Sequence, residues 1–189
     1  MRPLARLAAL AVSCVPIAAV AASPAAWTVD RGASTLRFSS SMAGRGFTGV
    51  FRRWAADIRF DPADPAASSV TAVIDVGSAV TGDADRDQAL PTDAFLDARA
   101  HPEASFVAHG FVPLGPGRYA ARGVLTPRGV SKPLTLPFTL EGSGPRARMT
   151  ASLAINRLAF GVGQGEWSAT TTIPAAVTVT ISLLASRVP

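Results

Sequence analysis

Apolar and polar residues alternate along most of the chain, which is the pattern of β-strands with one buried and one solvated face. The clearest case runs from Ala147 to Ile155, where the odd positions are apolar and most even positions are polar. Further alternating segments cover residues 35–40, 47–60, 70–76, 104–110, 119–125, 134–140 and 177–183. Together they give about eight strands separated by turn residues. The chain is therefore predicted to be all-β, either a barrel or a sandwich of antiparallel strands.

Two features interrupt the strand pattern. At Arg52 and Arg53 the alternation slips by one residue, which predicts a β-bulge. Residues 83–90 have an acidic first turn and are followed by Pro91, so they are predicted to form a short helix. The residues up to Asp97 are expected to add another turn, which gives a helical segment near 83–97.

The strand that starts at Ala147 runs into a polar corner, Asn156 and Arg157, which an aromatic–glycine pair follows at Phe160 and Gly161. Such a corner at the rim of a barrel is a reasonable place for the mouth of a ligand pocket. The alternative is a tight connection whose Asn and Arg side chains satisfy the backbone groups of the loop. The pattern by itself leaves both interpretations open.

The first 22 residues have the composition of a secretory signal peptide. Two arginines precede an apolar run that ends in small residues at Ala21 and Ala22. The run is shorter than the ~20 apolar residues that a membrane-spanning helix needs. We therefore expect residues 1–22 to be removed, a single domain over residues 23–189, and a periplasmic or secreted protein. Cys14 is the only cysteine and would leave with this segment, which excludes disulfides and thiolate chemistry in the mature chain.

Charge and motifs argue against several functional classes. Loss of Arg2 and Arg6 would lower the formal net charge from +5 to +3, and the chain has no Lys-rich run of the kind that binds nucleic acid. The sequence contains no G-x-S-x-G elbow, phosphate-binding loop or dinucleotide fingerprint, and His101 and His109 are not spaced as a close metal pair. It therefore predicts no catalytic residues, no metal and no cofactor apart from a bound lipid or quinone.

Several short motifs occur in order after residue 26. They are Trp27–Asp30 with Ser34–Phe38, Phe47–Phe51 with Ile58–Pro62, Thr81-Gly82 with Asp93–Asp97, His101–Phe106, Gly123–Pro133, and Ile155–Arg157 with Phe160–Val162. Together they resemble the YceI-like family of secreted, lipocalin-like proteins that bind polyisoprenoid lipids, and Gly123–Pro133 is the most specific match. The resemblance implies an eight-stranded antiparallel barrel with a long apolar pocket and no catalytic centre.

The chain departs from the family pattern at two places. The opening strand of the family often carries a histidine near its end, where this chain has Ser40-Ser41-Met42. The helical segment often has two adjacent aromatic residues, where this chain has Phe95-Leu96.

Small side chains at inward positions would leave room inside such a barrel, and larger apolar ones would form its walls. The predicted pocket residues are Phe38, Phe51, Trp54, Phe106, Ala108, Ala121, Leu125, Ala151 and Leu153. Ala151, in the middle of its strand, is expected to mark free volume. Because an isoprenoid tail has no hydrogen-bonding groups, buried area is expected to supply its affinity, at ~25 cal/mol per Å². The alternative is a barrel filled by its own side chains, and the family resemblance favours the ligand.

Arg52, Arg53 and Arg157 are the candidates for contact with a ligand head group, should that group be anionic. The predicted function is non-enzymatic binding or carriage of a polyisoprenoid or an isoprenoid quinone. One alternative is an enzyme that acts on a lipid or quinone, with Asp75, His109 or Arg157 at the pocket. The other is an interaction module for a membrane redox protein, which would show an exposed apolar patch. The sequence does not determine the oligomeric state.

Overall fold

The computed structural model describes residues 23–142 and 144–189, so the predicted signal peptide and Cys14 lie outside it. The strands are β1 (Ala26–Val29), β2 (Thr35–Met42), β3 (Arg45–Phe51), β4 (Trp54–Arg59), β5 (Ser69–Asp75), β6 (Ala79–Val80), β7 (Glu103–Gly115), β8 (Arg118–Thr126), β9 (Lys132–Glu141), β10 (Arg146–Asn156) and β11 (Ala176–Arg187). One α-helix, α1 (Ala84–Ala89), and 3₁₀ turns at Pro65–Ala67, Val76–Ser78, Arg157–Phe160 and Gly165–Ser168 complete the described elements. Within these residues no helix is both long and apolar enough to span a membrane.

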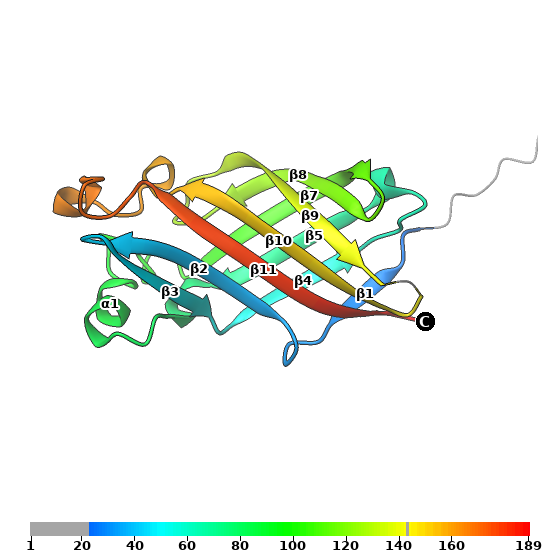
Figure 1. The fold of residues 1–189 in the computed structure, drawn as a ribbon, viewed down its shortest axis with the longest axis horizontal. Helices are drawn as coiled ribbons and strands as arrows, with labels where there is room; N and C mark the ends of the chain where they lie inside the picture. Colours follow the sequence, from blue (N-terminus) through cyan, green and yellow to red (C-terminus); the bar gives the residue numbers. More distant parts are fainter. Residues whose placement is uncertain (1–22, 143) are drawn as a thin grey trace, which may run out of the picture.

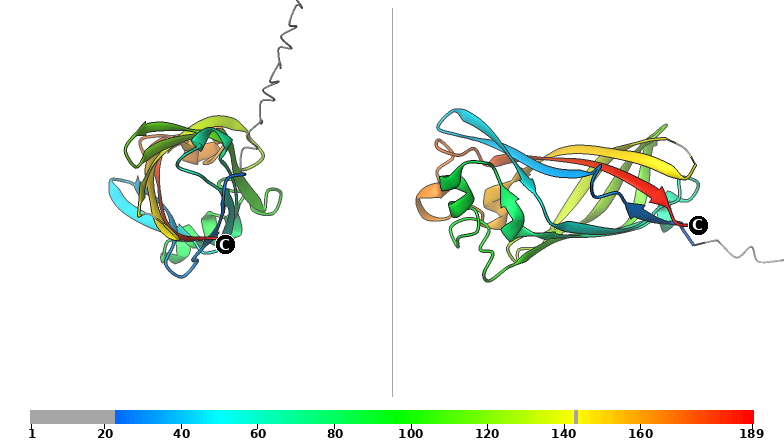
Figure 2. Two further views of the ribbon diagram at one scale, coloured as in Figure 1. Left: turned by 90° about the vertical axis from the view of Figure 1, so that its right-hand side faces the viewer. Right: turned by 90° about the horizontal axis from the view of Figure 1, so that it is seen from below.

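The strands close into an antiparallel barrel (Figure 1). The ring runs β1, β4, β5, β7, β8, β9, β10 and β11, and β11 pairs back onto β1. Seen along the long axis, the strands form a closed ring (Figure 2). The prediction of an eight-stranded antiparallel barrel with a short helix is confirmed.

Three of the eight strands are split into two pieces each. β1 and β2 both pair with β11, at opposite ends of it, so they form one interrupted strand. β3 pairs with β2, and β4 pairs with β1. The break between β3 and β4 falls at Arg52 and Arg53, where the alternation slips by one residue. β6 pairs with the end of β3 and continues the course of β5 after a 3₁₀ turn. β2 and β3 form a hairpin, and its tip extends beyond one end of the ring (Figure 1).

β7 contains an irregularity that corrects one detail of the sequence prediction. The alternation assigns Gly110 to the buried face with Ala108, but the pairing of β7 with β8 shifts between Ala108 and Phe111. Gly110 has a φ of +75°, a conformation that glycine adopts without steric cost, and its N–H donates to the Ser68 carbonyl at 2.7 Å. The bulge restores the inward phase at Phe111, which is buried.

An aromatic cluster fills one end of the barrel. Phe60, Phe111, Tyr119 and Phe138 pack with ring centroids 5.2–6.2 Å apart, mostly in edge-to-face or stacked pairs. These residues come from the ends of β7 and β9, the start of β8 and the residue after β4. The C-terminus lies at the same end of the barrel, opposite α1 (Figure 1). The cluster therefore closes the barrel at the end away from the helix.

The helix lies at the other end, with its start fixed by acidic side chains as predicted. The Asp83 carboxylate caps α1 by accepting from Arg86 N at 3.1 Å. The Asp87 carboxylate accepts from both the N–H and the hydroxyl of Thr81, at 2.6 and 2.7 Å, and these bonds hold the pKa of Asp87 below its ordinary value. The residues after Pro91 form turns that lie beside the mouth of the barrel (Figure 1).

Candidate ligand-binding cavity

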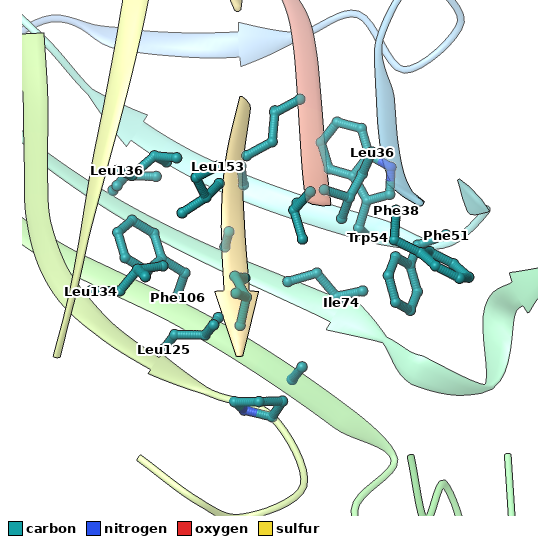
Figure 3. A pocket seen from close by; sticks show the side chains of 18 of the residues that line it. Leu36, Phe38, Phe51, Trp54, Ile74, Phe106, Leu125, Leu134, Leu136 and Leu153 are labelled. Carbon is teal, nitrogen blue, oxygen red and sulfur yellow. The ribbon is translucent and has the colours of Figure 1, made fainter. Parts of the chain in front are cut away.

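The barrel encloses an elongated cavity of about 350 Å³ between the aromatic cluster and the helical end. Apolar side chains from neighbouring strands point into it (Figure 3). They occupy every second position of each strand; on β4, for example, Trp54, Ala56 and Ile58 line the cavity while Ala55 is exposed. Among the described residues that line it, only Ser40 and Arg157 belong to a polar residue type, apart from tryptophan N–H groups.

The cavity is deep because the side chains in its middle are small. Ala56 on β4 pairs directly with Ala72 on β5, and both line the cavity. At the closed end, larger residues narrow it: Trp27 donates its indole N–H to the Phe60 carbonyl at 3.0 Å and lines the wall beside the aromatic cluster. The space therefore suits a long, narrow, apolar group.

Three loop segments form a cap over the helical end: residues 90–98, 127–131 and 157–175. Arg128 Nη1 donates to the carbonyls of Phe95 and Gly161, which belong to the two other segments. Backbone N–H groups of Gly163 and Gln164 both donate to the Ala94 carbonyl, at 2.9 and 2.8 Å. The cap places the apolar residues Leu90, Phe95, Leu96, Pro127, Phe160, Val162 and Ile173 against the cavity. Hydrogen bonds join the three segments, and their apolar residues line this end of the cavity.

Arg157 is buried and holds the longest cap segment together. Its Nε, Nη1 and Nη2 donate to the carbonyls of Pro174, Val162 and Ile173 at 3.0, 2.9 and 2.8 Å. Burial lowers the pKa of its guanidinium. Gly163, with a φ of +86°, lies so close to Nη1 that a side chain there would clash with the guanidinium. Arg157 therefore satisfies loop carbonyls and also lines the cavity.

The other two head-group candidates lie elsewhere. Arg52 and Arg53 are exposed at the break between β3 and β4 and do not line the cavity. Arg53 Nε pairs with Asp75 Oδ2 at 2.7 Å on the surface. Arg31 stacks over the ring of Trp54 with its guanidinium carbon 4.3 Å from the centroid. At this break, the side chains of Arg53 and Arg31 contact protein groups, and Arg52 is exposed.

The structure distributes the predicted apolar pocket residues over two regions. Six of them line the cavity and are labelled in Figure 3: Phe38, Phe51, Trp54, Phe106, Leu125 and Leu153. Ala121 lines it as well. Ala108 and Ala151 are also buried inside the barrel, at 1% and 7% exposure, but they pack within the core cluster that includes Phe106 and Phe138. Neither residue is among those that line the cavity.

Ser40 lines the cavity and was absent from the predicted site. Its place on the face of Leu36 and Phe38 is visible in the alternation, and a polar residue on an otherwise apolar face was the available signal.

Of the residues suggested for catalysis, Asp75 and His109 do not line the cavity, and His109 is exposed. Within residues 23–142 and 144–189, no three His, Cys, Asp or Glu side chains gather as metal ligands would. The geometry supports binding of an apolar molecule.

Comparison with known proteins agrees with this architecture. The family model described as YceI-like domain matches residues 27–185. A UPF0312 protein of Pseudomonas savastanoi is 32% identical over 174 residues, which cover 87% of this chain and 91% of the relative. The crystal structure of Burkholderia cenocepacia BcnA is 31% identical, with a TM-score of 0.81 over 84% of this chain and all of that one.

A more distant structural neighbour is a polyisoprenoid binding domain from Saccharophagus degradans. It is 19% identical, with a TM-score of 0.69 over 87% of this chain and 99% of that domain, and so shares the fold. The match of the family model over nearly the whole described barrel confirms the resemblance seen in the motifs. The chain belongs to the YceI-like family.

Proposed function

We propose that this protein binds and carries a long-chain apolar lipid, a polyisoprenoid or an isoprenoid quinone, without changing it chemically. The observation that carries the proposal is the cavity itself, which is long, lined by apolar side chains and covered by an apolar cap. A ligand that buries roughly 300 Å² of its apolar surface there would gain about 7.5 kcal/mol before the costs of association, at ~25 cal/mol per Å². The structural neighbour named as a polyisoprenoid binding domain has the same fold, which supports this ligand class.

The proposed site of action is the periplasm or the outside of the cell. This proposal rests on the N-terminal sequence, with its two arginines, apolar run and small residues at Ala21 and Ala22. In that location a covered cavity would shield an apolar chain from water between membranes. If the cargo is a quinone, the partner that supplies or receives it is a membrane redox protein. Intact-mass measurement of the exported protein tests the location, because the mature chain should start at Ala22 or Ser23.

Mass spectrometry of lipid extracted from protein purified from its native envelope tests the cargo. The expected result is an isoprenoid with a long linear chain of prenyl units, present in stoichiometric amount. Incubation of pure protein with a prenyl diphosphate or a quinone should return the compound unchanged. Stoichiometric recovery of a polar ligand, or steady product formation that depends on Arg157, would overturn the proposal.

A further inference from the structure

Ser40 lines the apolar cavity, and its hydroxyl, which is buried in the cavity wall, makes no hydrogen bond to the protein. Its Oγ is the one buried side-chain nitrogen or oxygen, within the residues the structure describes, that makes no hydrogen bond. On the same face of β2, Leu36 and Phe38 precede it, and Phe47 faces it across the β2–β3 pair. All three neighbours are apolar and line the cavity, so none of their side chains can accept or donate to the hydroxyl.

An unpartnered hydroxyl in an apolar wall costs free energy, because the group has lost its water and gained nothing. An alanine at the same position of β2 would avoid this cost and would keep the apolar face of the strand. The unpaired hydroxyl therefore destabilises the ligand-free barrel, and a hydrogen bond to a ligand oxygen would remove this free-energy cost. We infer that Ser40 is the polar contact of this cavity and that it hydrogen-bonds a neutral oxygen, a hydroxyl or a carbonyl, at the head of an isoprenoid chain. This inference rests on the proposed lipid-binding function.

The position of Ser40 indicates how the ligand would lie. Ser40 is two residues from the end of β2, and the neighbouring residue Ser39 pairs with Thr178 near the start of β11. The backbone N–H of Ala43, just beyond β2, donates to Thr172 in the cap. Ser40 thus lies at the cap end of the cavity, and the aromatic cluster closes the other end. The head of the ligand would sit under the cap and its tail would run toward the aromatic cluster.

The surroundings favour a neutral head group over a diphosphate. Arg157 is the one charged residue among the described cavity-lining residues, and all three of its nitrogens already donate to loop carbonyls. A diphosphate placed at Ser40 would lose its hydration with a single hydroxyl as compensation, which is far too little for a charged group. A prenol or a prenyl quinone presents an oxygen that one hydroxyl can satisfy.

Four probes with the same tail test the inference: geranylgeraniol, a naphthoquinone with a geranylgeranyl tail, geranylgeranyl diphosphate, and the hydrocarbon of the same skeleton without the hydroxyl. Their affinities for delipidated parent protein, Ser40→Ala and Ser40→Thr are measured by displacement of a fluorescent apolar probe. Ser39→Ala, on the opposite face of the same strand, is the matched control. The prenol and the quinone should bind Ser40→Ala about threefold to tenfold more weakly than the parent, as expected for one hydrogen bond.

The hydrocarbon should bind the parent and Ser40→Ala equally, Ser40→Thr should recover the affinity for the prenol, and Ser39→Ala should match the parent throughout. The diphosphate should bind the parent more weakly than the prenol. Equal affinities of parent and Ser40→Ala for the prenol and the quinone would overturn the inference while leaving lipid binding intact. An equal loss for the hydrocarbon would also overturn it, because the effect would then come from shape. Failure of the parent to take up any of the four probes would instead overturn the proposed function, and the inference with it.

Discussion

Ala56→Trp offers the sharpest test of whether the barrel interior is a ligand cavity or a packed core. Ala56 points into the cavity from the middle of β4, and its partner across the strand pair, Ala72, is equally small and also lines the cavity. An indole at position 56 would enter the free space of about 350 Å³ in the cavity. Ala55, one residue away and exposed on the outer face, provides a matched control in Ala55→Trp.

The expected loss of affinity follows from area. A tryptophan side chain buries roughly 150–250 Å². If it denies a bound chain about 100 Å² of contact, the binding free energy weakens by about 2.5 kcal/mol, or roughly 60-fold, at ~25 cal/mol per Å². Because the indole enters empty space, the free energy of unfolding of the ligand-free variant should stay within about 1 kcal/mol of the parent, below the ~1–3 kcal/mol typical of overpacking.

The measurements are thermal unfolding of the delipidated proteins and titration with an isoprenoid alcohol. Ala55→Trp should match the parent in both, since its indole lies in solvent. The reasoning is refuted if Ala56→Trp loses several kcal/mol of stability, which would show a packed interior. It is equally refuted if the variant binds the lipid as tightly as the parent, which would place the ligand elsewhere.

Four further predictions concern the core cluster, the cap and the helix. Ala151→Trp should destabilise the empty protein by about 1–3 kcal/mol in chemical denaturation, because Ala151 packs in the core cluster. Phe138→Ala should lower the free energy of unfolding by about 3–5 kcal/mol in the same assay, since the Phe138 ring contacts three other aromatic rings. Arg128→Met removes the bonds to Phe95 and Gly161 and should speed lipid release severalfold in stopped-flow displacement, with little change in melting temperature. Hydrogen bonds lower the pKa of Asp87, so the stability that they contribute is fully present above the unfolded pKa of about 3.8 and is lost as pH falls through the lower folded value. In Asp87→Asn, the melting temperature should therefore fall less steeply than in the parent between about pH 5 and 2.

The sequence by itself determined most of the strands and their faces. Alternation from Ala147 to Ile155 predicted β10 to within one residue at each end, because residues two positions apart share a face of a strand. The phase slip at Arg52 and Arg53 located the break between β3 and β4 for the same local reason. The acidic residues before and within α1 predicted its position, since capping is also local.

Only the tertiary structure decided where the interior is empty and where it is full. Ala56 and Ala151 are both small residues on inward faces, yet Ala56 lines the cavity, whereas Ala151 is buried in the core cluster and does not line it. The difference depends on the volumes of side chains from strands far apart in the sequence, which alternation does not encode. The partners of Arg157 and the lack of a partner for Ser40 depend in the same way on cap and strand segments that only closure of the barrel brings together.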